Sequence, residues 1–299
     1  MHGHDHPHGS ATRAFAIVTL VNLAYTVVEA GYGFATDSLA LLSDALHNLG
    51  DVLGLGLAWG AAVLARRLPT ERHTYGWRRA TLLSPLANAL LLVAFAGALS
   101  WEALRRFSEP PPIPAMAVIV VAAVGIVVNL GTAALFHRDQ AGDLNRRGAY
   151  LHLLSDAAVS VAAVLAGLGL WKLGWRWLDP ALAAAVALLV AWSGWGLLRA
   201  SFRQAMDAVP EHLDLAQVQD FLEAWPGVQA VHHLHIWPIG AAEIALTAHV
   251  VRSGTDGHDA FLDEVAQALA ERFGINHATV QVELGPGCAH DHDDPAPHH

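Results

Sequence analysis

The chain has 299 residues, of which 54% are hydrophobic and only 15% carry charge. Soluble domains average about 25% charged residues, so this composition argues against an ordinary soluble protein and indicates a membrane protein with a modest soluble part. The single cysteine, Cys288, excludes a disulfide framework and cysteine-based zinc fingers.

Charge is distributed unevenly along the chain. Residues 206–299 hold 15 acidic and two basic residues, a net charge of −13, whereas residues 1–205 hold 12 acidic and 15 basic residues, a net charge of +3. Nucleic-acid binding needs a basic footprint, so the acidic C-terminal part argues against that partner. It favours cations, although an acidic surface that merely keeps the domain soluble is an alternative.

Residues 1–12 are expected to form a His-rich cytoplasmic arm that could gather metal loosely. The start of the chain lacks the basic region and cleavage site of a signal peptide, so the first apolar run is expected to remain as a transmembrane helix. Six apolar segments of about the length that spans a bilayer follow within residues 13–205. They lie at residues 13–34, 39–65, 80–104, 115–137, 148–171 and 180–201.

The basic residues between these segments predict their orientation. Placing the N-terminus in the cytoplasm puts 11 of the 15 basic residues of 1–205 inside and four outside. Both termini and the soluble domain are therefore expected to be cytoplasmic, in a bacterial inner membrane.

From residue 206 the pattern becomes that of a small soluble domain, 206–285. Helical spacing at 213–224 is followed by two strands of a hairpin, 228–237 and 243–251, then a helix at 258–273 and a strand at 277–284. The predicted fold is therefore membrane α-helical with six transmembrane helices, followed by a cytoplasmic α+β (αββαβ, ferredoxin/metallochaperone-like) domain. Residues 286–299 are expected to be a flexible tail rich in His and Asp.

Two His-x-x-x-Asp pairs lie in apolar segments, His47 with Asp51 and His152 with Asp156. Residues four apart share one face of a helix, and ionisable groups at membrane depth are costly and usually functional. Together the pairs offer two imidazoles and two carboxylates, a tetrahedral set that suits zinc, whereas copper(I) prefers sulfur ligands and manganese prefers more carboxylates.

The same ligands can couple metal to protons, because metal binding requires them to be deprotonated. Asp44, three residues before His47, could orient the imidazole, relay protons, or make only a helix-packing hydrogen bond. Glu29 could belong to a proton path or lie near a membrane interface.

Four motifs occur in order along the chain, at Asp37–Asp51, His73–Arg79, Asn145–Asp156 and Val231–Trp237. With them the chain resembles the cation diffusion facilitator family, of the zinc/cadmium efflux type, from about residue 13 to 285. The resemblance implies a homodimeric metal/proton antiporter with its transport site at the two His-x-x-x-Asp pairs. In this family, a His at the position of His47 is associated with a preference for zinc and cadmium over manganese.

The resemblance implies two further metal sites. The first, in the loop after the second helix, would use His73, but Trp77 and Thr70 stand where the family has His and Asp, so Glu71 is the remaining substitute. The second, in the cytoplasmic domain, would use four residues and bind a regulatory zinc. They are His232, His249, His258 and Glu283.

The cytoplasmic site has some support from the residues themselves. His232 and His249 fall on neighbouring predicted strands and His258 opens the next helix, so the three side chains can converge. His233 and His235 are additional candidates, and Gln281 stands where some family members have His. A loose cluster in the tail, at 288–293, could bind metal weakly or be only solvated.

The function expected from the sequence is secondary active transport, with cytoplasmic Zn²⁺ exported in exchange for protons by alternating access. Cd²⁺, Co²⁺, Ni²⁺ and Fe²⁺ are other candidate substrates. A passive divalent-metal channel and a metal-sensing membrane protein are the alternatives. An intramembrane zinc enzyme is disfavoured because four ligands close the tetrahedron and no His-Glu-x-x-His motif occurs; no Walker motif for ATP occurs either.

Overall fold

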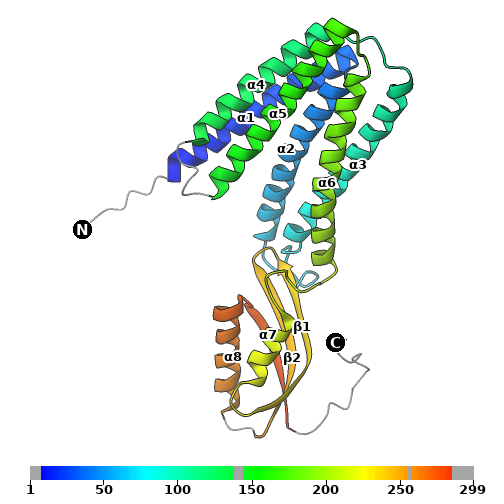
Figure 1. The fold of residues 1–299 in the computed structure, drawn as a ribbon. Coiled ribbons are helices and arrows are strands. Elements are labelled where there is room, and N and C mark those ends of the chain that lie inside the picture. Colours follow the sequence, from blue (N-terminus) through cyan, green and yellow to red (C-terminus); the bar gives the residue numbers. More distant parts are fainter. Residues whose placement is uncertain (1–7, 138–143, 255–256, 285–299) are drawn as a thin grey trace, which may run out of the picture. The chain divides into compact units, whose positions relative to one another are not determined.

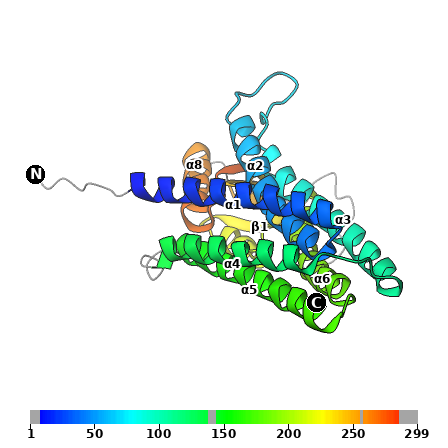
Figure 2. The same ribbon diagram turned by 90° about the horizontal axis from the view of Figure 1, so that it is seen from above.

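The computed structural model describes residues 8–137, 144–254 and 257–284. The chain divides into two compact units, one made of residues 1–57 with 87–197 and the other of residues 58–86 with 198–299. Figure 1 traces the ribbon along the chain, and Figure 2 gives the view from above.

Six long helices correspond to the six predicted membrane segments. In the described part of the chain, the five helices α2 to α6 are long and apolar enough to cross a membrane. The prediction of a helical membrane domain is confirmed. The helices are α1 (His8–Thr36), α2 (Leu39–Ala65), α3 (Ala80–Ser108), α4 (Ala115–His137), α5 (Leu144–Leu173) and α6 (Leu178–Ala205).

Small residues allow the membrane helices of the first unit to pack closely. Ala103 of α3 and Ala183 and Ala187 of α6 are fully buried, and they pack with Leu39 of α2 and Leu99 of α3. Such small residues let helix backbones approach one another where no hydrophobic effect drives association. Helices α4 and α5 lie side by side, with α1 alongside α4 (Figures 1 and 2).

The second unit contains the predicted αββαβ domain. Its elements are α7 (Leu215–Glu223), β1 (Val228–Gly240), β2 (Glu243–Arg252), α8 (His258–Phe273) and β3 (His277–Glu283). Asp214 caps α7 by accepting a hydrogen bond from the Ala216 amide at 3.0 Å, as expected of an acidic N-cap. Gly274 ends α8 in the left-handed conformation (φ 68°) that glycine adopts most readily.

The three strands form a mixed sheet in the order β1-β2-β3. Strands β1 and β2 are antiparallel, as predicted for a hairpin, whereas β2 and β3 are parallel. The core of the domain joins the two helices to the sheet through Val218, Leu222, Val265 and Leu269, all fully buried, and through Leu246 of β2. Strand β1 extends three residues beyond the predicted end, up to Gly240.

Polar contacts join the loop after α2 to the α+β domain within the second unit. Arg78 pairs with Glu243 at the start of β2. Arg79 binds Asp207 at 2.8 Å. These ion pairs give the Arg-rich loop a structural role.

Candidate metal centres

The four residues predicted for the transport site converge between α2 and α5. The Nε2 atom of His152 lies 3.2 Å from Oδ2 of Asp51 and 3.5 Å from Oδ2 of Asp156. His47 Nε2 lies 3.8 Å from Oδ1 of Asp156. The spacing of four residues along each helix thus places both pairs on facing sides of α2 and α5.

These separations fit ligands that share one ion. Zinc bonds of about 2.0–2.1 Å in a tetrahedron place neighbouring ligand atoms about 3.3 Å apart. The His152 contacts are close to that value, while His47 is the more distant member, with its ring centroid 6.1 Å from that of His152.

Burial differs across this cluster. Asp156 is only 1% exposed, and its Oδ1 atom, 3.8 Å from Nε2 of His47, has no hydrogen-bond partner among the described residues. Asp156 nevertheless lines, together with Asp51 and His152, a cavity of about 170 Å³ between α1, α2 and α5. An ion could therefore reach the site from that cavity.

Asp44 and Glu29 form a second, deeper acidic pair. Both are almost completely buried, at 2% and 0% exposed, and the Tyr25 hydroxyl donates a hydrogen bond to Oε1 of Glu29 at 2.8 Å. Asp44 lies within electrostatic reach of Glu29 and of Asp156. The pair extends a line of buried acidic groups away from Asp156.

The cytoplasmic domain brings three of its four predicted ligands together, one from each strand. His232 of β1 pairs in register with His249 of β2, and both point to Glu283 of β3. The distances are 3.2 Å from His232 Nε2 to Oε2 and 2.9 Å from His249 Nδ1 to Oε1. All three candidate ligand atoms lie within 4.8 Å of one another, which suits a shared zinc ion.

The fourth predicted ligand, His258, is not part of this cluster. It stands at the first position of α8. His233 lies closer: its ring centroid is 5.2 Å from that of His232 and 5.0 Å from that of His249. A bulge in β1, where His233 has a positive φ of 50°, explains why two consecutive histidines approach the same cluster.

Gln281 also supports the cluster, at the position where the family resemblance allows a histidine. Its amide nitrogen donates a hydrogen bond to Oε1 of Glu283 at 3.0 Å and so orients the carboxylate. The sequence offered no signal for this contact beyond the alternation of side chains along β3.

The residues predicted for the loop site, His73 and Glu71, lie in the loop after α2. The ring of His73 stacks on that of Trp77, with centroids 4.4 Å apart, in the place where a second imidazole was expected. Within the described residues, no cluster of three ligating side chains includes His73 or Glu71. The tail cluster at 288–293 and the histidines at 2, 4 and 6 lie outside the described residues.

The fold defines the chain as an integral membrane protein, with a helical bundle followed by a soluble domain of a small mixed sheet and helices. Comparison of the sequence with known protein families identifies the family to which it belongs. Residues 15–205 match the cation efflux transmembrane domain, and residues 210–284 match the cytoplasmic domain of cation efflux proteins. The chain belongs to the cation efflux family, whose related members are transporters and not enzymes.

Three relatives are similar over nearly their whole length. The zinc transporter ZitB of Escherichia coli is 37% identical over 298 residues, covering 96% of this chain and 95% of the relative. The metal cation efflux system protein CzcD of Cupriavidus metallidurans is 36% identical, covering 95% and 90%. The cadmium, cobalt and zinc/H(+)-K(+) antiporter of Bacillus subtilis is 35% identical, covering 97% and 94%.

One solved structure is also similar, the metal-bound C-terminal domain of the CzcD transporter from Cupriavidus metallidurans. It is 41% identical and covers 24% of this chain and 100% of the solved chain, with a TM-score of 0.23.

Proposed function

We propose that the chain exports Zn²⁺, and also Cd²⁺ and Co²⁺, from the cytoplasm in exchange for protons. The observation that carries this proposal is the convergence of two imidazoles and two carboxylates between α2 and α5, in a chain of the cation efflux family. Relatives named as a zinc transporter and as a cadmium, cobalt and zinc/H(+)-K(+) antiporter support the choice of ions. Ni²⁺ and Fe²⁺ suit the same donors and are secondary candidates.

The proposed exchange follows from the chemistry of the four ligands. Zinc enters from the cavity beside Asp51 and His152, and it needs carboxylates that are ionised and imidazoles that are neutral. Binding of the metal therefore releases protons from the ligands. After the site has become accessible from the other side of the membrane, protons that bind the ligands help to expel the ion. The buried pair Asp44 and Glu29 is proposed to carry protons to and from Asp156.

Alternating access distinguishes this proposal from a passive channel. A channel needs a continuous water path, whereas the cavity beside the ligands holds only about 170 Å³ and Asp156 in its lining is 1% exposed. A metal sensor without transport would not need ligands at membrane depth, where ionisable groups are costly.

We propose a separate role for each of the two domains of the chain. Residues 13–205 transport the ion, while the three-stranded cytoplasmic domain, 206–285, binds a regulatory zinc at His232, His249 and Glu283 and joins two copies into a homodimer. The arm at 1–12 and the tail at 286–299 would collect metal weakly. We propose that the protein lies in a bacterial inner membrane, with both termini in the cytoplasm.

Zinc flux into liposomes, with and without an imposed pH gradient, tests the proposal. We expect saturable flux that rises when protons run down their gradient in the opposite direction to zinc. His47→Ala and Asp156→Ala should each abolish it. Flux that ignores the gradient would exclude exchange with protons, and normal transport by both variants would exclude the site.

A further inference from the structure

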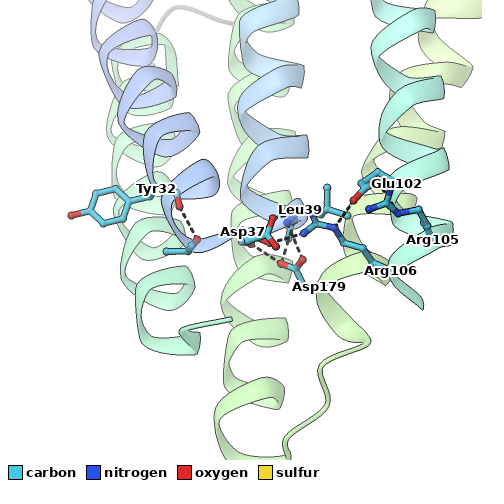
Figure 3. Close-up of polar contacts among 10 residues, drawn as sticks. Tyr32, Asp37, Leu39, Glu102, Arg105, Arg106 and Asp179 are labelled. Carbon is cyan, nitrogen blue, oxygen red and sulfur yellow. Dashed lines mark hydrogen bonds and ion pairs between the residues drawn. The ribbon is translucent and has the colours of Figure 1, made fainter. Parts of the chain in front are cut away.

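A polar cluster holds the start of α2 to the start of α6 (Figure 3). Asp179, in the first turn of α6, is only 5% exposed. It accepts hydrogen bonds from the Ser38 hydroxyl at 2.6 Å, the Leu39 amide at 2.9 Å and the Ala40 amide at 3.3 Å. A carboxylate suits this position, because the first amides of a helix lack partners within the helix and carry partial positive charge.

The same helix start is held from another side by α3. Arg106 donates hydrogen bonds to the backbone oxygen and to Oδ1 of Asp37, both at 2.7 Å, and Glu102 orients its guanidinium at 2.8 Å (Figure 3). Asp37 has a positive φ of 56°, a left-handed conformation that is uncommon outside glycine, although aspartate tolerates it better than most residues. The turn between α1 and α2 is therefore held in one shape by contacts with α3 and α6.

Helix formation alone does not require Asp179. Ser38 occupies the N-cap position of α2, and its own hydroxyl accepts a hydrogen bond from the Leu41 amide at 3.4 Å. A serine cap is sufficient to begin a helix. The buried carboxylate adds a connection between two helices, and a buried charge is costly unless such a connection compensates for it.

This cluster lies at the first turn of α2, whereas the cavity beside the transport ligands lies along the middle of the helix. The cavity is lined by Asn22 of α1, by Asp51 and Leu55 of α2, and by Ala149 near the start of α5. Leu39 and Asp51 are 12 residues apart, about 18 Å along a helix. The ligands are thus open toward the end of α2 that follows Asp51, while the preceding end is closed by polar contacts.

Apolar side chains beside the polar cluster also pack the start of α2 against α3 and α6. Leu39 packs with Leu99 and Ala103 of α3 and with Ala183 and Ala187 of α6. The first turns of α2 are therefore joined to α3 and α6 by apolar packing as well as by the polar cluster. Separating them would expose Asp179 and the first amides of α2 to water in one step, which makes two discrete arrangements more favourable than a gradual series.

We propose that Asp37, Ser38, Arg106 and Asp179 form an outer latch of the transport cycle. Asp179 and Arg106 are positioning residues that hold the start of α2 while the ligands are open to the cavity. The latch opens when the metal site becomes accessible from the opposite side of the membrane. This inference rests on the proposed alternating access.

Sided transport kinetics test the latch. Asp179→Asn keeps the shape of the side chain but removes its charge, and Arg106→Gln removes the contact with Asp37. Zinc uptake is measured with the full chain in vesicles of known orientation, with zinc offered either on the cavity side or on the latch side. Arg105→Gln is the matched control, because Arg105 neighbours Arg106 but pairs with Glu102 at the surface.

A weakened latch lowers the population of the arrangement that is open to the cavity. The apparent KM should then rise about three- to tenfold for zinc on the cavity side and fall for zinc on the latch side, since apparent affinity scales with the competent fraction. Asp179→Glu should restore both values in part, and Arg105→Gln should change neither.

A merely structural role would give a different result. If Asp179→Asn and Arg106→Gln lower the maximal rate while KM stays unchanged on both sides, or if Arg105→Gln has the same effect as they do, the latch is refuted. Failure of the proposed function is distinguishable, because the unsubstituted chain would then show zinc flux that does not respond to a pH gradient.

Discussion

Asp156→Asn is the substitution that probes the proposed transport site most directly. Asparagine keeps the shape of the side chain, so helix packing at this buried position should survive. The change removes the negative charge that lies 3.8 Å from His47 and 3.5 Å from His152. It therefore isolates the contribution of one ligand to metal binding.

The size of the effect can be worked from the four-ligand geometry. Zinc held by four protein ligands is stabilised by about 10–16 kcal/mol in small peptides, so one ligand accounts for about 2.5–4 kcal/mol, or about a 10²- to 10³-fold change in Kd. Water in the cavity that Asp156 lines could replace the carboxylate oxygen only as a neutral ligand. We expect zinc affinity at this site to fall by at least about 100-fold.

Calorimetric zinc titration of the detergent-solubilised chain would measure the change, since the cytoplasmic cluster provides an internal reference. The variant should lose the class of binding sites in the membrane and keep the cytoplasmic class. Ser155→Ala is the matched control, because the Ser155 hydroxyl donates only to its own helix, to the Leu151 carbonyl at 3.0 Å. An unchanged number of sites and unchanged flux in Asp156→Asn would refute the assignment.

Three further substitutions test separate parts of the chain. His47→Asp should let manganese compete better for zinc uptake, because carboxylates suit harder ions; unchanged competition would contradict the role of this imidazole in selectivity. Gly54→Ala would place a methyl group 2.6 Å from the Asn88 amide nitrogen, an overpacking that costs about 1–3 kcal/mol in thermal unfolding. Gly56→Ala, with no described atom within 4 Å of the new carbon, should not destabilise the chain and serves as its control. Asp214→Ala should cost the α+β domain about 1 kcal/mol through loss of the α7 cap, and an unchanged melting temperature would argue against it.

Local patterns predicted the elements well, because hydropathy and capping act over short stretches of chain. The Asp214 cap and the Gly274 stop lie where α7 begins and α8 ends. The register in which the strands pair could not be predicted from local patterns. The bulge that turns His233 toward His232 and His249 depends on how β1 pairs with β2, and neither strand encodes that pairing by itself.

The donor types of the proposed transport site and their spacing of four residues can be read from the amino-acid order, because helical periodicity fixes which residues share a face. Which of these groups meet depends on how the helices and strands pack. That packing brought Asp51 of α2 to His152 of α5, left His258 outside the cytoplasmic cluster, and stacked Trp77 on His73. Contacts between residues about a hundred positions apart arise from helix packing and strand pairing, and no local pattern contains that information.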